Sequence, residues 1–241
     1  MKEYLSSYWI ILFVSILSAD LTFRFSLTRK IFWLNDTLLH EAGHAITSIL
    51  TFHSPRTIKI FWNQSGVTET AYTISILGYF SRIITLLAGY PSGIFFGSLL
   101  ILTPLVKQPF IVLGIFTCIG VLVLLLSRTL LSFILSIGLL ISVYLSNLLL
   151  QSQDELYGVT LSIILGSILV FYSFKSIQNL SRNILNNDEE ETDIHFLRDI
   201  IFVPKKVLLV IYWGIFVISP IGAFYFVHFL NFIYDFILSY L

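Results

Sequence analysis

The sequence has little charge and almost no cysteine. Lys and Arg total 14 of 241 residues and Asp and Glu another 14, so charged side chains make up 12% of the chain. Soluble domains carry about a quarter. This balance gives no sign of a nucleic-acid partner. The single cysteine, Cys118, excludes a disulfide within the chain and a cysteine-based metal site. It lies in an apolar stretch, where we expect a small buried hydrophobic residue.

Apolar side chains are in excess, at 56% of residues. A water-soluble core could not enclose so much apolar surface, whereas a helix that crosses a bilayer needs about 20 mostly apolar residues. The sequence therefore predicts an all-α polytopic membrane protein with about seven transmembrane helices, six to eight being compatible. These segments are 5–25, 31–52, 80–105, 109–127, 129–150, 157–178 and 205–230.

The segments form one integral membrane domain over residues 1–241. The last segment either continues through Pro220 with a kink or is followed by an eighth segment. Basic residues lie in several loops that alternate sides in this assignment, so the orientation in the membrane stays open.

Two segments depart from the helical pattern. Residues 56–72, RTIKIFWNQSGVTETAY, are rich in β-branched and aromatic residues and contain NQSG as a turn, so they predict a β-hairpin. Residues 182–199 contain NNDEEETD and predict an acidic loop. Non-helical backbone beside a bilayer is tolerated only where protein or a wet cavity covers it. The predicted hairpin comes directly after the helix that carries the histidines, so we expect protein or a wet cavity to cover it.

The stretch LLHEAGHAITS, residues 38–48, places three ionisable groups inside the predicted helix 31–52. Positions i and i+4 lie on one helix face, so His40 and His44 can share one metal ion while Glu41 reaches a water on that ion. Left unpaired in a membrane, such groups carry a heavy free-energy penalty. The spacing therefore predicts a metal site on this helix.

A catalytic zinc site needs more than the motif supplies. Such sites have three protein ligands and an open position, where the metal lowers the pKa of a bound water and a carboxylate accepts the proton. Glu41 is placed for the second role. A third ligand must come from elsewhere in the chain. Just upstream, Asn35 and Asp36 are possible N-caps of the motif helix.

Three blocks of sequence resemble the site-2-protease-like intramembrane zinc metalloproteases, specifically their short bacterial branch without a PDZ domain. The first block, HEAGHA at 40–45, is specific for a metalloprotease. The other two are suggestive. They are SGVTET with the glycine helix LLAGYPSGIFFGSLLIL at 86–102, and TDIHFLRDIIFVPKKVLLVIYW at 192–213. Together the blocks span most of residues 38–213, although the connecting helices match only in hydrophobicity.

The resemblance implies a Zn²⁺ ion held by His40, His44 and a later aspartate, with Glu41 as the base. It also implies cleavage of peptide bonds at or in the membrane. Asp193 is the best match for the aspartate. Better-known members carry this residue in an Asp-Gly pair, and this sequence has no such pair.

The third ligand has alternatives. Thr192 or Asp193 could instead cap the helix that the periodic run after them predicts. Asp154 is the next candidate ligand, followed by Glu69 in the hairpin. His195, two residues from Asp193, could support the site from behind its ligands.

The predicted helix at 80–105 carries Gly89, Gly93 and Gly97 on one face. Small residues at this spacing let membrane helices approach closely. We expect the stripe to pack within the chain, and it also offers a possible surface for a homo-oligomer.

Three functions from different classes remain compatible with the sequence. The first is an intramembrane zinc endopeptidase that acts on a membrane-anchored protein, with an extended substrate strand added to the hairpin. The second is a non-proteolytic membrane protein with a structural or vestigial metal site. The third is a transporter, which an inverted repeat or a second broken helix would favour, and we find neither. We expect a multi-pass protein of the bacterial plasma membrane.

Overall fold

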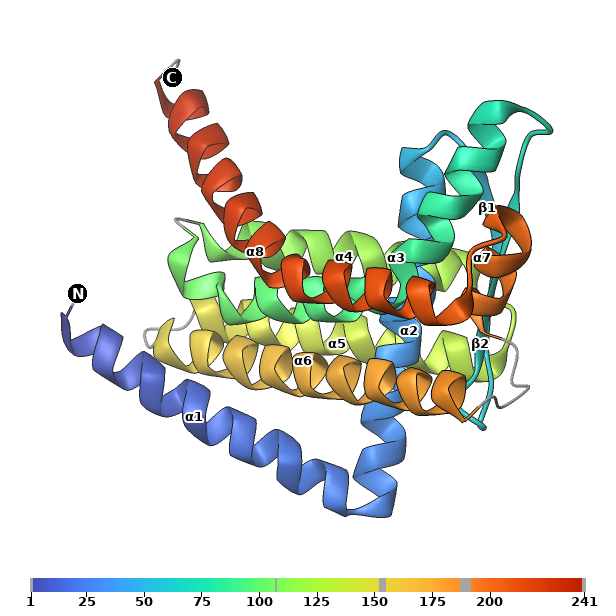
Figure 1. The fold of residues 1–241 in the computed structure, drawn as a ribbon. Coiled ribbons are helices and arrows are strands. Elements are labelled where there is room, and N and C mark those ends of the chain that lie inside the picture. The colour runs from blue at the N-terminus through green and yellow to red at the C-terminus, as the bar shows by residue number, and fades with distance from the viewer. Residues whose placement is uncertain (1, 107, 152–154, 187–191, 240–241) are drawn as a thin grey trace.

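The computed structural model describes residues 2–106, 108–151, 155–186 and 192–239. Within them the chain forms eight α-helices, a 3-10 helix and a two-stranded sheet (Figure 1). In chain order the elements are α1 (Lys2–Arg24), α2 (Ser26–Leu50), β1 (Ser54–Ile60), β2 (Gly66–Ala71), α3 (Ile76–Ile101), η1 (Thr103–Leu105), α4 (Pro109–Leu126), α5 (Leu130–Gln151), α6 (Glu155–Leu185), α7 (Asp193–Ile201) and α8 (Lys205–Leu238).

Five of the described helices, α3, α4, α5, α6 and α8, are long and apolar enough to cross a membrane. Helices α1 and α2 pass the same test only together, and they are bent by 111° at the break between them. The chain is thus a multi-pass membrane protein with five or six candidate spans. The predicted fold class is confirmed, while the count of five or six candidate spans lies at or just below the lower end of the expected range of six to eight.

The bend between α1 and α2 changes the path of the motif helix. Phe25, the residue between the two helices, has extended backbone angles, so the first helix stops there and the second starts in a new direction. In Figure 1, α2 crosses the direction of α5 and α6 instead of running beside them. The segments predicted as two separate spans, 5–25 and 31–52, are therefore α1 and this crossing helix.

Helix α8 answers the question left open at Pro220. It is one helix from Lys205 to Leu238 with Pro220 inside it, so no separate eighth segment forms. Proline lacks the N–H of a helical hydrogen bond and its ring crowds the preceding turn. The bend of α8 away from the bundle in Figure 1 fits that effect.

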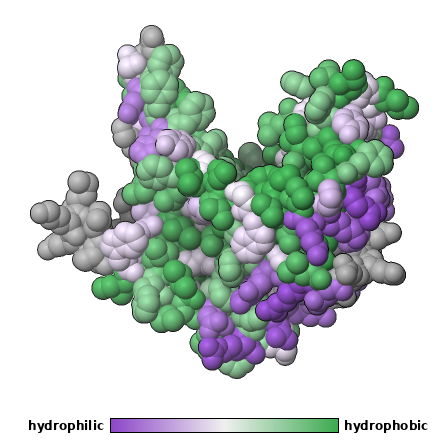
Figure 2. Space-filling view, in the orientation of Figure 1, coloured by the Kyte–Doolittle hydropathy of each residue, from purple (hydrophilic) through white to green (hydrophobic). Residues whose placement is uncertain are grey.

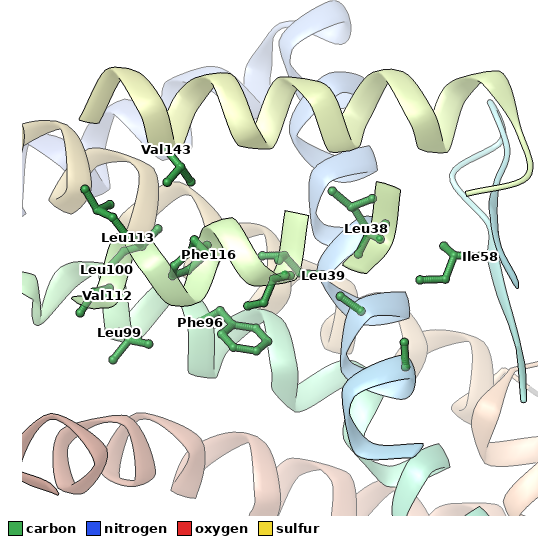
Figure 3. Close-up of a cluster of buried hydrophobic side chains, with 14 of the residues drawn as sticks. Leu38, Leu39, Ile58, Phe96, Leu99, Leu100, Val112, Leu113, Phe116 and Val143 are labelled. Atoms are coloured by element: carbon green, nitrogen blue, oxygen red, sulfur yellow. The ribbon is translucent and has the colours of Figure 1, made fainter. Parts of the chain in front are cut away.

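The motif helix is embedded in the main hydrophobic core. Leu38 and Leu39, directly before His40, are buried among side chains of α3, α4 and α5 and near Ile58 of β1 (Figure 3). In a membrane, helices associate through close packing more than through removal of apolar surface from water. This packing fixes one face of α2 and leaves the face with the motif turned toward α3 and α7.

The space beside the glycine stripe of α3 (Gly89, Gly93 and Gly97) is occupied by other helices of the same chain. A Cβ atom at Gly89 would meet side chains of α2, one at Gly93 would meet side chains of α2 and α6, and one at Gly97 would meet the backbone of α6. All three glycines are buried. The stripe is therefore the place where α2, α3 and α6 approach most closely, and α2 and α6 already occupy the face suggested for a second copy.

Cys118 is exposed on α4, so the expectation of a buried residue was wrong. Helix α4 is one of the candidate spans, and exposure there means contact with lipid. The apolar neighbours of Cys118 could not reveal this, because lipid-facing and core-facing positions of a membrane helix are both apolar.

Candidate metal centre

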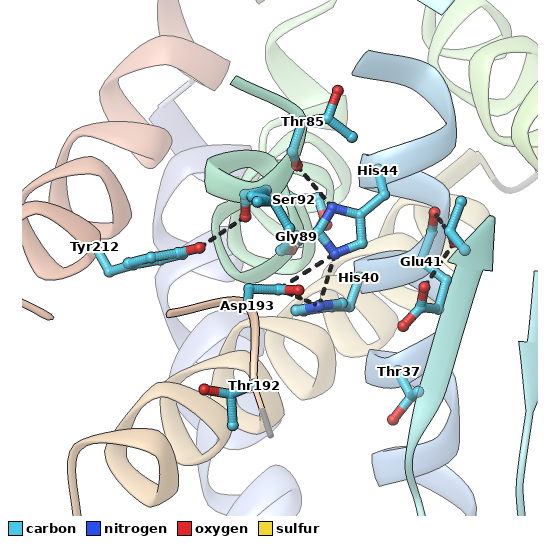
Figure 4. A network of polar contacts seen from close by, with 12 residues as sticks. Thr37, His40, Glu41, His44, Thr85, Gly89, Ser92, Thr192, Asp193 and Tyr212 are labelled. Carbon is cyan, nitrogen blue, oxygen red and sulfur yellow. Dashed lines mark hydrogen bonds and ion pairs between the residues drawn. The ribbon is translucent and has the colours of Figure 1, made fainter. Parts of the chain in front are cut away.

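Helix α2 brings the two motif histidines together on one face. Their Nε2 atoms lie 3.0 Å apart, and the two rings meet edge to face. Figure 4 shows both rings converging on Asp193, with Glu41 on the side of the hairpin. The predicted spacing argument for His40 and His44 therefore holds in three dimensions.

The ring of His44 has a defined orientation. Its Nδ1 atom lies 2.7 Å from the backbone carbonyl oxygen of Thr85 on α3. A carbonyl only accepts hydrogen bonds, so Nδ1 carries a proton, and Nε2 is the atom that presents a lone pair once its own proton gives way to a metal ion. Metal-binding histidines are commonly oriented in this way by a partner behind the ring.

Asp193 reaches the histidines from the first residue of α7. Its Oδ2 atom lies 3.0 Å from Nε2 of His40 and 3.2 Å from Nε2 of His44. Thr192 is the N-cap of α7, so the cap and the candidate ligand are different residues. His195 Nδ1 lies 2.9 Å from the Thr192 hydroxyl and holds this end of the helix in place.

The charge state of Asp193 suits a ligand. Burial alone would raise the pKa of its carboxyl, but the attraction of His44 and His40 outweighs burial and holds the pKa well below its ordinary value. The carboxylate is thus ionised at neutral pH, the form in which it binds a cation.

The Nε2 atoms of His40 and His44 and the Oδ2 atom of Asp193 are arranged as ligands of a metal ion and not as hydrogen-bond partners of one another. Asp193 Oδ2 is buried and close to both Nε2 atoms, yet it makes no hydrogen bond of acceptable geometry. Three lone-pair atoms 3.0 to 3.2 Å apart repel unless a proton or cation lies among them. A tetrahedral zinc centre with bonds of about 2.05 Å would separate its ligand atoms by about 3.3 Å. The donor set and its spacing therefore fit zinc.

Glu41 is fixed by the hairpin. Its side chain is 4% exposed, and the Thr68 hydroxyl of β2 donates a hydrogen bond of 2.6 Å to its Oε2 atom. A Cβ atom at Gly66 would collide with the same carboxylate. Glycine at this position of β2 therefore leaves the space that the Glu41 carboxylate occupies. One turn earlier on α2, Thr37 donates to the Gln64 carbonyl oxygen at 3.0 Å. These two bonds align the hairpin along α2.

A cavity of about 430 Å³ opens beside these groups. It lies between α2, the hairpin, α6 and α7, and its walls include His40, Glu41 and Asp193. Much of the remaining wall is polar, with Asn, Gln and Ser side chains from the hairpin turn and α6 and with Thr37 and Thr192. His40, Glu41 and Asp193 therefore face a space large enough to admit water.

The model of the Peptidase M50B-like family matches residues 8–224. The chain belongs to this family. The match includes all three blocks that resemble site-2-protease-like peptidases, so that resemblance is confirmed at the level of the family. No curated protein and no solved structure matched the chain.

The other candidate ligands do not join the site of this M50B-like protein in the described residues. Glu69 lies on β2, where its carboxylate is 2.6 Å from Lys59 Nζ. The hydrogen bond from Lys59 lowers the pKa of that carboxyl, so Glu69 already has a cationic partner. Asp154 and residues 187–191 of the predicted acidic loop lie outside the described residues.

Several supporting residues of this family member were not predicted. Thr85 and Thr68 gave no signal, because a single threonine on a helix or strand does not show which backbone or carboxylate it will meet. Asp36 was predicted only as a possible N-cap, but α2 begins at Ser26 and Asp36 is buried inside the helix. Its position four residues before His40 was the one available signal.

Proposed function

We propose that the protein is a zinc metallopeptidase that hydrolyses peptide bonds of membrane-anchored proteins. His40, His44 and Asp193 would hold the ion, and Glu41 would act as the general base. The observation that carries this proposal is the triangle of Nε2, Nε2 and Oδ2 atoms beside the buried Glu41 carboxylate. When bound, zinc lowers the pKa of a water molecule and polarises the carbonyl group of the substrate.

Glu41 is equipped to move the proton. Thr68 holds its Oε2 atom, and this leaves Oε1 to take the proton of the attacking water and pass it to the leaving amine. Close packing between Gly66 and the carboxylate restricts its rotation. A base held through Oε2 and packed against Gly66 keeps the same orientation through both transfers.

The hairpin offers one free strand edge for an extended substrate. The outer edge of β1 is covered by the α4–α5 connection: the Arg128 N–H donates to the Ile58 carbonyl oxygen at 3.0 Å, and the Thr129 hydroxyl donates to that of Ile60. Strand β2 pairs only with β1 in the described sheet. A substrate strand added to β2 would therefore run past Glu41.

The same end of the molecule carries a concentration of basic residues. Figure 1 places the hairpin, α7, the end of α6 and the start of α8 together, and Figure 2 shows hydrophilic residues gathered on that side. Basic residues on these elements and on the adjoining α4–α5 connection are Arg56, Lys59, Arg128, Arg182, Arg198, Lys205 and Lys206.

The segment between α3 and α4 has one Lys, and that between α5 and α6 has neither Lys nor Arg. The excess of basic residues favours a cytoplasmic location for the hairpin end. We therefore place substrate cleavage near the cytoplasmic surface of the membrane.

The test compares wild type with Glu41→Gln. The two proteins would be reconstituted into liposomes with a panel of single-span membrane proteins, and both zinc content and cleavage products would be measured. We expect equal zinc content and loss of cleavage only in Glu41→Gln. Asp20→Asn is the matched control, since Asp20 on α1 is paired with Arg24 at 2.8 Å, and it should cleave normally. Zinc in both proteins without cleavage by wild type would favour a structural metal site instead.

A further inference from the structure

Asp36 is a buried carboxylate that the proposed reaction leaves without a role. It is 5% exposed and lines the same cavity as His40, Glu41 and Asp193. It lies on α2, four residues and about one turn before His40. A buried carboxylate costs several kcal/mol unless other groups compensate its charge. Its partners therefore indicate what it does.

The immediate partners of Asp36 are hydroxyl groups. The Ser173 hydroxyl of α6 donates a hydrogen bond of 2.5 Å to its Oδ1 atom, and Ser176 contributes a second interaction. The described wall of the cavity includes no Lys or Arg, and no described cation forms an ion pair with Asp36. The titratable group that acts on its carboxylate electrostatically is His40.

His40 lacks the support that His44 has. Thr85 fixes the tautomer of His44 through Nδ1, whereas the described hydrogen bonds and ion pairs of His40 all involve Nε2. Helical side chains lean toward the N-terminus, which is the direction in which Asp36 lies from His40 on α2. Both side chains line the cavity, which has room for a bridging water.

Helix α3 has a glycine opposite each of the two ionisable side chains, His40 and Asp36. A Cβ atom at Gly89 would lie 2.6 Å from His40 Nε2, and one at Gly93 would lie 2.8 Å from Asp36 Oδ1. The two glycines are one turn apart, as are the two α2 residues they face. The close approach of α3 therefore keeps Asp36 and His40 in one fixed arrangement.

We propose that Asp36 is a positioning residue of the metal centre. Its carboxylate accepts, through a water in the cavity, the Nδ1 hydrogen bond of His40, and this directs the Nε2 lone pair toward Asp193 and His44. Removal of such an outer partner typically lowers metal affinity about 10- to 100-fold. The inference rests on the proposed metal site but not on peptidase activity.

The test measures zinc affinity of the full-length protein by competition with a chromophoric chelator. We expect Asp36→Asn to bind zinc about 10- to 100-fold more weakly than wild type. Asp20→Asn, the same chemical change on α1, should bind like wild type. Ser173→Ala removes the α2–α6 hydrogen bond but keeps the charge, and we expect a smaller loss of affinity. The d–d spectrum of the cobalt-substituted proteins reports ligand geometry and should change in Asp36→Asn.

Two results would overturn the inference. One is Asp36→Asn with wild-type zinc affinity and cobalt spectrum, including the case in which only the KM for a substrate rises. The other is equal loss of affinity and of thermal stability in Asp36→Asn and Ser173→Ala, which would make Asp36 a purely structural link between helices. Absence of zinc from wild type would instead refute the proposed metal site, and zinc without cleavage would refute only the peptidase.

Discussion

A methyl group added at Gly89 should disrupt the metal centre without unfolding the bundle. In Gly89→Ala the new Cβ would lie 2.6 Å from Cε1 and Nε2 of His40 and 2.7 Å from Cε1 of His44, whereas an ordinary contact begins at 3.4 Å. One ring or both must move by about 0.8 Å. Metal–ligand distances tolerate only about 0.2 Å, and a 1 Å misplacement in an active site lowers the rate about 100-fold.

The assay for Gly89→Ala is zinc content together with cleavage rate, measured beside thermal unfolding. We expect weaker zinc binding and at least about 100-fold slower cleavage, with the unfolding transition retained. The matched control is Gly114→Ala on α4, where a Cβ atom meets nothing within 4 Å. That change should leave zinc and cleavage unaltered and stabilise the helix by up to about 1 kcal/mol. Normal zinc binding and cleavage in Gly89→Ala would refute the described contact between α3 and the two rings.

Three further changes test separate parts of the site. Thr68→Val removes the 2.6 Å hydrogen bond to Glu41 and should lower kcat about 10- to 100-fold without loss of zinc, because hydrogen bonds to charged groups contribute about 1.5–3 kcal/mol. An unchanged kcat would count against a role of Thr68 in holding the base. Val67→Pro on β2 removes the N–H that the register directs at Lys59 of β1, so it should distort the hairpin and abolish cleavage while zinc content stays unchanged, with Val67→Thr as the control; cleavage by the proline variant would count against a role of the hairpin in substrate binding. Asp193→Ala should lose zinc while Glu69→Ala keeps it, and the reverse result would identify Glu69 as the third ligand.

The sequence predicted the parts of the site whose geometry is local. His40, Glu41 and His44 lie within five residues of one helix, so the helical repeat alone places them. The hairpin at 56–72 followed from its composition and turn, and the structure places it at Ser54–Ala71. Asp193 could be ranked first only through the family resemblance, because nothing local shows that the first residue of α7 reaches the histidines of α2.

Features that depend on the path of the chain could not be predicted. The bend at Phe25 has no proline or glycine to mark it, so α1 and α2 were counted as two spans. That count made successive loops alternate sides and hid the gathering of basic residues at the hairpin end. The role of Asp36 was hidden for a similar reason, since its partner Ser173 is 137 positions away.

X-ray absorption at the zinc edge reports directly whether His40, His44 and Asp193 bind one zinc ion together. For the purified wild-type protein we expect one bound zinc with two imidazole nitrogens and otherwise oxygen ligands, at about 2.0–2.2 Å and without sulfur. The spectrum should change in Asp193→Ala if any zinc remains. Wild-type protein without stoichiometric zinc, or a spectrum unaltered in Asp193→Ala, would contradict this three-residue site.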